Sequence, residues 1–157
     1  MPIYYQDQLE NIAACNLGIR VDRAAARIVV TPGTTLFTVT GGNVIMTWFI
    51  GEVVVAQSAT ACTLDLVHTP TVGTATTIAT GATDIQSALA GTMLMLPAAL
   101  GGTLTETATA YGVPEQRARY ILRPGVMSVF GSDTPTGSIQ WTMWYVPIDY
   151  GAYVTGG

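Results

Sequence analysis

Glycine and proline divide this chain into short segments that are rich in threonine, valine and isoleucine. Such β-branched residues favour strands, and Gly-Gly and Pro-Gly pairs favour the turns between them. The expected strands are Arg27–Thr31, Thr34–Thr40, Asn43–Gln57, Cys62–His68, Thr74–Thr80, Thr92–Leu96, Gly101–Thr109, Tyr120–Leu122, Val126–Phe130 and Ser138–Ile148. About eight to ten strands at this spacing predict one all-β domain, a β-sandwich or barrel. Eight strands arranged as two Greek keys would make it jelly-roll-like.

The segment Thr83–Ala90 departs from the strand pattern. Thr83 suits the N-cap of a helix, and Gln86 follows it at the spacing of a capping box. Apolar residues then recur at helical spacing as far as Gly91, which favours a helix end. We therefore expect one short helix of about two turns here.

The first twenty residues precede the strong strand signals and carry the aromatic pair Tyr4 and Tyr5. We expect residues 1–20 to form an extended N-terminal arm and residues 21–157 to form the single β-sandwich domain. Such an arm is either disordered or ordered by lying on a neighbour. Its aromatic content favours the second arrangement, so Tyr4 and Tyr5 are candidate interface residues.

The segment Ser138–Ile148 alternates most clearly between its two faces. One face should carry Ile139, Trp141, Met143 and Tyr145, and the other Gln140, Thr142, Trp144 and Val146. One face belongs in the core, so Trp144 packs against either a second core layer or another subunit. The segment Asn43–Gln57 is either one long strand or two strands bent at Gly51.

Charge is scarce, since only 10% of the residues are charged and lysine is absent, whereas soluble domains average about 25%. A surface with so little charge is expected to be covered by other copies or other proteins. The net charge of −4 argues against nucleic-acid binding, which needs a basic surface. The arginines form two sequence clusters: Arg20, Arg23 and Arg27, then Arg117, Arg119 and Arg123. Biased composition explains them as well as interface anchoring does.

Residues suited to catalysis or metal binding are few. His68 is the single histidine, and no GxSxG motif accompanies it. Cys15 and Cys62 form neither a CxxC motif nor a disulfide framework, so we expect two buried thiols. Glu52 lies in an apolar strand, where we expect it to pair with an arginine. We predict no catalytic, cofactor-binding or metal-binding residue, and no enzyme activity.

No membrane or secretion signal is evident in the sequence. The longest apolar run, Val44–Ala56, is too short for a membrane helix and contains Glu52. The polar N-terminal segment lacks the basic and apolar regions of a signal peptide. We therefore expect neither a membrane partner nor a secretory leader.

Three features together resemble the virion proteins of tailed bacteriophages: the threonine-rich strands Thr34–Thr40 and Thr74–Thr80, the arm Met1–Arg20, and the ending GSIQWTMWYVPIDYGAYV. The chain is most similar to the jelly-roll capsid decoration, or cement, proteins. The resemblance implies a homodimer or homotrimer on the capsid surface of the virion, made in the host bacterial cytoplasm. It also implies binding to the outside of the assembled head, where such proteins stabilise contacts between major capsid subunits.

Two other functions remain open from the sequence. One is a tail, baseplate or head–tail connector component. The other is a carbohydrate- or receptor-binding β-sandwich that uses Trp48, Trp141 or Trp144 as a stacking platform. For the decoration function, the candidate interface residues are Tyr4, Tyr5, Arg20, Arg23, Arg27, Arg117, Arg119, Arg123 and Trp144.

Overall fold

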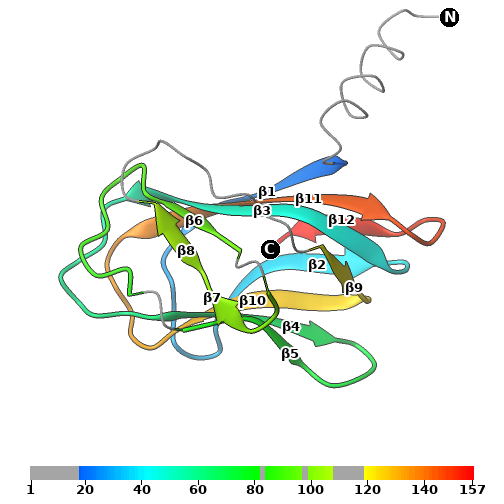
Figure 1. Ribbon diagram of the computed structural model, residues 1–157, viewed down its shortest axis with the longest axis horizontal. Helices are drawn as coiled ribbons and strands as arrows, with labels where there is room; N and C mark the ends of the chain where they lie inside the picture. Colours follow the sequence, from blue (N-terminus) through cyan, green and yellow to red (C-terminus); the bar gives the residue numbers. More distant parts are fainter. Residues whose placement is uncertain (1–17, 82–83, 97–98, 108–118) are drawn as a thin grey trace, which may run out of the picture.

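The computed structural model describes residues 18–81, 84–96, 99–107 and 119–157, and these form two stacked β-sheets without a helix (Figure 1). Sheet A contains, in spatial order, β1 (Ile19–Ala26), β11 (Ser138–Pro147), β3 (Val44–Val55), β6 (Met93–Met95) and β8 (Thr105–Thr107), with β9 (Tyr120–Leu122) also paired to β3. Sheet B contains β12 (Tyr153–Gly156), β2 (Thr34–Thr40), β10 (Gly125–Gly131), β4 (Leu64–Pro70), β5 (Thr76–Thr80) and β7 (Gly102–Thr103). The predicted all-β sandwich is confirmed.

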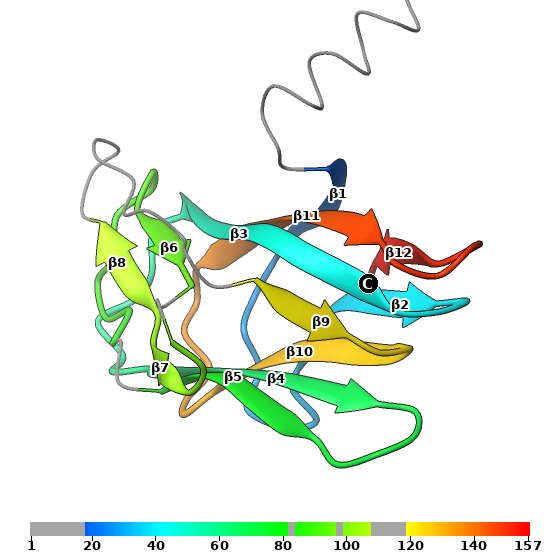
Figure 2. The ribbon, with the colours of Figure 1, turned by 45° about the vertical axis from the view of Figure 1, so that its right-hand side comes forward.

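The main strands pair in a nested order. β4 pairs with β5, β3 with β9, β2 with β10, and β1 with β11, each pair antiparallel. Successive pairs belong alternately to sheets B and A, so the chain resembles one long hairpin folded over itself (Figure 2). The segment between β5 and β9 adds β6, β7 and β8, and β12 extends sheet B beside β2.

The core lies between the two sheets. On β11 the residues predicted to face inward are all buried: Ile139, Trp141, Met143 and Tyr145. Gln140, Thr142 and Trp144 between them are partly exposed, which confirms the predicted alternation. The Phe49 ring on β3 lies 5.1 Å from Trp141 and 6.3 Å from Phe37 on β2, between ring centroids. Aromatic packing thereby joins the two sheets.

The helix expected at Thr83–Ala90 is not found in residues 84–90; Thr83 lies outside the described residues. Oδ1 of Asp84 accepts hydrogen bonds from the backbone N–H groups of Cys62 and Gln86, at 2.9 and 3.0 Å. Asp84 also bridges to Thr63, and Ser87 has a positive φ of 57°. Bonds from a side chain to the backbone offer the chain an alternative to a helix, and here they hold the segment against the two residues that precede β4.

The first strand also differs from expectation. The segment Arg27–Thr31 contains no strand, and β1 instead spans Ile19–Ala26. Oγ1 of Thr34 accepts from the backbone N–H of Val29 and donates to the carbonyl of Arg27. These local bonds replace a strand ladder and turn the chain from sheet A into sheet B.

Two further segments are now defined. β3 is a single strand that continues through Gly51, so it is not divided there. The predicted strand Gly101–Thr109 is instead two strands in different sheets, β7 and β8, which flank the buried Leu104. Residues 1–17 of the expected N-terminal arm lie outside the described residues.

Candidate interaction surface on sheet A

The outward side chains of sheet A form four rows across its strands, and we call this surface the outer face. Strand register defines the rows: Val146, Ile45 and Ile121; Arg20, Trp144 and Trp48; Asp22, Thr142 and Ile50; and Gln140, Glu52 and Met93. The residues between them along β3 and β11 point into the core. No described strand lies over this face in either view (Figures 1 and 2).

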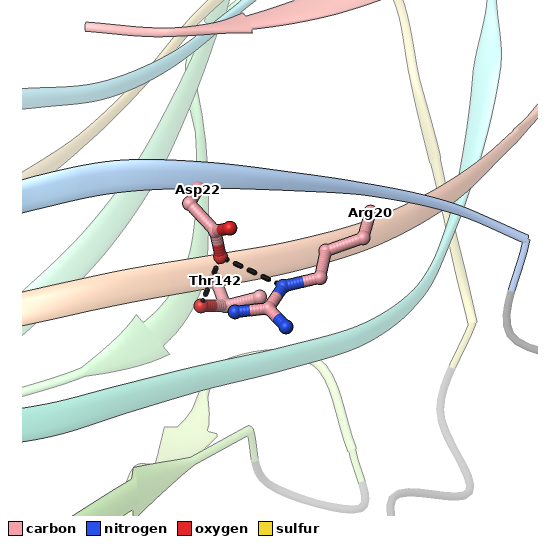
Figure 3. Close-up of polar contacts among 3 residues, drawn as sticks. All are labelled: Arg20, Asp22 and Thr142. Atoms are coloured by element: carbon pink, nitrogen blue, oxygen red, sulfur yellow. Dashed lines mark hydrogen bonds and ion pairs between the residues drawn. The ribbon is translucent and has the colours of Figure 1, made fainter.

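Arg20, Asp22 and Thr142 form a polar group at the β1 side of this face (Figure 3). Nε of Arg20 lies 2.9 Å from Oδ1 of Asp22, and the Thr142 hydroxyl donates to the same oxygen at 2.7 Å. Partial burial opposes ionisation of Asp22, but the hydrogen bonds from Thr142 and Arg20 and the Arg20 charge lower its pKa. The side chains of Arg20 and Asp22 are 58% and 44% exposed, so this pair contributes at most about 1 kcal/mol.

The guanidinium of Arg20 also lies over Trp144, 5.6 Å from the ring centroid. This distance is within the range of a cation–π contact. Trp144 is partly exposed, and it follows Trp48 in the same row. Trp144 and Trp48 therefore form an aromatic pair on the outer face.

A shallow pocket of about 160 Å³ opens on the outer face. Its lining combines apolar and polar groups: Arg20, Ile50, Glu52, Met93, Gln140, Thr142 and Trp144. Glu52 was expected to be buried beside an arginine, but it is exposed and forms no ion pair with a described residue. The physical reason is strand register, because Glu52 lies between the inward Gly51 and Val53 and so points outward.

The first arginine cluster separates in space. Arg23 is partly buried, and its Nε donates to the carbonyl of Thr35 on β2 at 3.0 Å. This bond joins β1 of sheet A to sheet B, and burial lowers the pKa of Arg23. Nε of Arg27 donates to the carbonyl of Pro135 at 3.0 Å, in the loop between β10 and β11. The three arginines therefore act in different places: Arg20 on the outer face, Arg23 between the two sheets, and Arg27 at the β10–β11 loop.

The second arginine cluster flanks β9. Arg119 and Arg123 are exposed on either side of Ile121, which is 67% exposed. Neither arginine forms an ion pair with a residue that the structure describes. Their alternating spacing does not place them on one outward face, because Nη1 of Arg123 lies by the turn between β4 and β5, 3.9 Å from where a Cβ atom at Gly73 would be. Arg117, Tyr4 and Tyr5 lie outside the described residues.

A second pocket, of about 280 Å³, lies beside Arg123 and contains His68, Thr74 and Thr76 in its lining. His68 is buried, with Nε2 3.1 Å from the carbonyl oxygen of Arg123. Burial lowers the pKa of His68 more than this hydrogen bond raises it. A neutral ring that donates from Nε2 fits this geometry, so His68 fixes the end of β9 and adds no charge to the pocket.

The turn between β11 of sheet A and β12 of sheet B forms another exposed apolar patch, which we call the C-terminal turn patch. Its members are Ile148, Tyr150 and Tyr153. Tyr150 is fully exposed, and the turn projects at the right-hand end of Figure 1. The sequence interpretation did not single out these residues, although two tyrosines beside Gly151 were a visible signal.

Groups suited to chemistry are sparse in the described part of the chain. It contains no group of three or more His, Cys, Asp or Glu residues placed to hold a metal ion. Cys62 is a free buried thiol, and its burial raises its pKa. No helix in the described residues is long and apolar enough to cross a membrane.

Comparisons with known proteins give no family assignment. The chain matches no protein-family model, no curated protein and no solved structure.

Proposed function

We propose that this chain is a virion structural protein, a capsid decoration protein that binds the outside of the assembled head. Its partners would be other copies of itself and the major capsid protein, whose subunit contacts it stabilises. The observation that carries the proposal is that one charge-poor domain exposes apolar side chains both on the outer face and on the C-terminal turn patch. A protein that braces neighbours needs more than one such surface.

The nested strand order supports a jelly-roll assignment within this proposal. In a jelly roll, eight strands pair first with last, second with seventh, third with sixth, and fourth with fifth. The strands β1, β2, β3, β4, β5, β9, β10 and β11 pair in this way. Jelly rolls include viral capsid and lectin domains, so the fold alone is compatible with several functions.

Binding that requires an assembled shell would stabilise that shell by mass action. The C-terminal turn patch is suited to this role because its tyrosines combine an apolar ring with a hydrogen-bonding hydroxyl. The net charge of −4 gives the protein little attraction for packaged nucleic acid. The proposal therefore places the chain on the outer capsid surface.

The test is to mix purified protein with unexpanded and expanded phage heads that lack it. Co-sedimentation measures binding, and electron microscopy locates the added density. We expect binding to expanded heads only, and we expect Tyr150→Asp with Tyr153→Asp to reduce it at least tenfold. Absence of binding to both head forms would contradict the proposal. Density at a tail or connector would favour a tail component, and a glycan-array signal would favour carbohydrate binding.

A further inference from the structure

We propose that the side of the sandwich where β9 lies near the β4–β5 hairpin binds a small carboxylic acid with an apolar body. The inference adds a ligand site to the molecule and does not depend on attachment to a capsid. It stands on two adjoining cavities, one of them largely apolar, and on Arg123, which has no ion-pair partner among the described residues.

The two cavities lie where the sheets come together at β9. β9 belongs to sheet A, and β4 and β5 belong to sheet B on the same side of the sandwich (Figure 2). The first cavity has a volume of about 280 Å³ and the second about 170 Å³. They share the lining residues His68, Thr76 and Ile121, so they adjoin. Pockets for small ligands generally measure about 300–1,000 Å³, so the two cavities together suit a small molecule.

The second cavity has a largely apolar wall. Tyr120 and Leu122 on β9 lie in register with buried residues of β3, so their side chains face the interior between the sheets. Ile78 on β5, which is buried, and Leu100, which is 58% exposed, also line this cavity. Such a wall favours an apolar group that is removed from water.

The first cavity is polar and carries one positive charge. Arg123 lines it, and Nη1 of Arg123 lies 3.9 Å from where a Cβ atom at Gly73 would be, so the guanidinium reaches the β4–β5 turn. Thr74 and Thr76 are exposed in the same lining. No described residue that lines either cavity is Asp or Glu, and the buried His68 adds no charge. The cavity therefore favours an anion.

A carboxylate suits this combination better than a more highly charged group. The planar guanidinium can hold both carboxylate oxygens with two parallel hydrogen bonds, and threonine hydroxyls can also donate to an anion. The single charge of Arg123 neutralises one carboxylate, whereas a phosphate monoester would bring nearly two negative charges. The apolar wall of the second cavity then accepts the body of the acid. The expected ligand is a monocarboxylic acid with an aliphatic or aromatic body.

The test titrates the 157-residue protein with sodium octanoate in a calorimeter, up to about 10 mM. An acid of about ten non-hydrogen atoms should dissociate at about 0.1–1 mM. Octanamide has the same body without the charge, so it should bind at least tenfold more weakly. Acetate has the charge without the body and should show no measurable binding. In NMR spectra, octanoate should shift the amide resonances of Thr74 and Thr76 and leave those of β1 unchanged.

Variants separate the charge from the apolar wall. Arg123→Gln should weaken octanoate binding at least tenfold, because it removes the cation. Arg119→Gln is the matched control, since Arg119 is an exposed arginine before β9 that lines neither cavity, and it should leave binding unchanged. Leu100→Ser should weaken octanoate binding severalfold without changing the charge. Because all three side chains are exposed, the variants should keep the melting temperature of the wild type.

Three results would each overturn the inference: no octanoate binding in this range, equal binding of octanamide, or equal losses in Arg123→Gln and Arg119→Gln. Resonance shifts confined to the outer face would also overturn it, because they would place the acid in the pocket beside Arg20. The head-binding test depends on Tyr150 and Tyr153, which line neither cavity. Failure of either proposal therefore leaves the other standing.

Discussion

A substitution at Gly51 tests how tightly the core of this sandwich is packed. A Cβ atom at this position would lie 2.5 Å from Cζ3 and 2.7 Å from Cε3 of Trp141. Trp141 is fully buried and packs on Phe49, so its ring has little room to move. Gly51→Ala therefore overpacks the core and should destabilise the protein, although an extended backbone accepts alanine.

The magnitude follows from the displacement that the ring must make. Relief of a 2.5 Å contact requires movement of about 1 Å in a close-packed interior, and overpacking of this kind costs about 1–3 kcal/mol. For a chain of this length, each kcal/mol lowers the melting temperature by about 2–4 °C. At a cost in the middle of this range, about 2 kcal/mol, we expect Gly51→Ala to lower it by about 4–8 °C.

A double-mutant cycle separates this clash from a general effect of alanine. Trp141→Phe removes part of the ring, together with a buried indole N–H that has no hydrogen-bond partner among the described residues. The double variant Gly51→Ala/Trp141→Phe should be more stable than the sum of the single effects predicts, by at least about 0.5 kcal/mol. Gly81→Ala is the matched control, because its closest contacts are with side chains of Asp65 and Thr63. Calorimetry or urea unfolding measures the free energy of unfolding of all five proteins, and additive costs of the two single substitutions would refute the clash.

Three further predictions concern burial and loop anchoring. Burial lowers the pKa of His68 below its ordinary 6.5. As the pH falls below 6.5, the unfolded chain therefore binds a proton at His68 before the folded protein does. The free energy of unfolding is thus highest above pH 6.5 and falls as the pH is lowered. Urea unfolding should show this loss at up to about 1.4 kcal/mol per pH unit, and His68→Asn should reduce the pH dependence. In a Cys15→Ser background, Ellman's reagent should react with the buried Cys62 only after unfolding; rapid reaction in the folded state would contradict its burial. Arg27→Ala removes the bond to the Pro135 carbonyl, so it should cost about 1 kcal/mol and increase proteolysis in the β10–β11 loop; an unchanged cleavage rate would contradict this anchoring role.

The sequence was most predictive where a strand had one buried face. The alternation of Ser138–Ile148 correctly separated Trp141 from Trp144, because strand side chains point to opposite faces with a period of two. The all-β class followed from the same periodicity and from the turn residues. Local patterns were less predictive where side chains bond to the backbone, as at Asp84 and Thr34. There the partner lies on a remote strand or across a turn, and periodicity contains no information about it.

The candidate surface was predicted only in part, for a related reason. An outward Trp144 was expected, but its neighbours depend on strand register between β1, β11 and β3, which residue type alone does not define. Glu52 shows the same limit. An apolar segment suggested a buried carboxylate, whereas the pairing of Glu52 with Gln140 places it on the outer face.

The contacts of the described arginines also give a physical reason why this chain uses arginine and no lysine. Arg23 and Arg27 each donate to backbone carbonyls of distant segments, and Arg20 combines an ion pair with a contact over Trp144. A planar guanidinium can hold a fixed hydrogen bond and stack on a ring at once, which a lysine ammonium cannot. Three of the described arginines thus serve the fold itself, and only Arg119 and Arg123 remain as unpaired exposed cations.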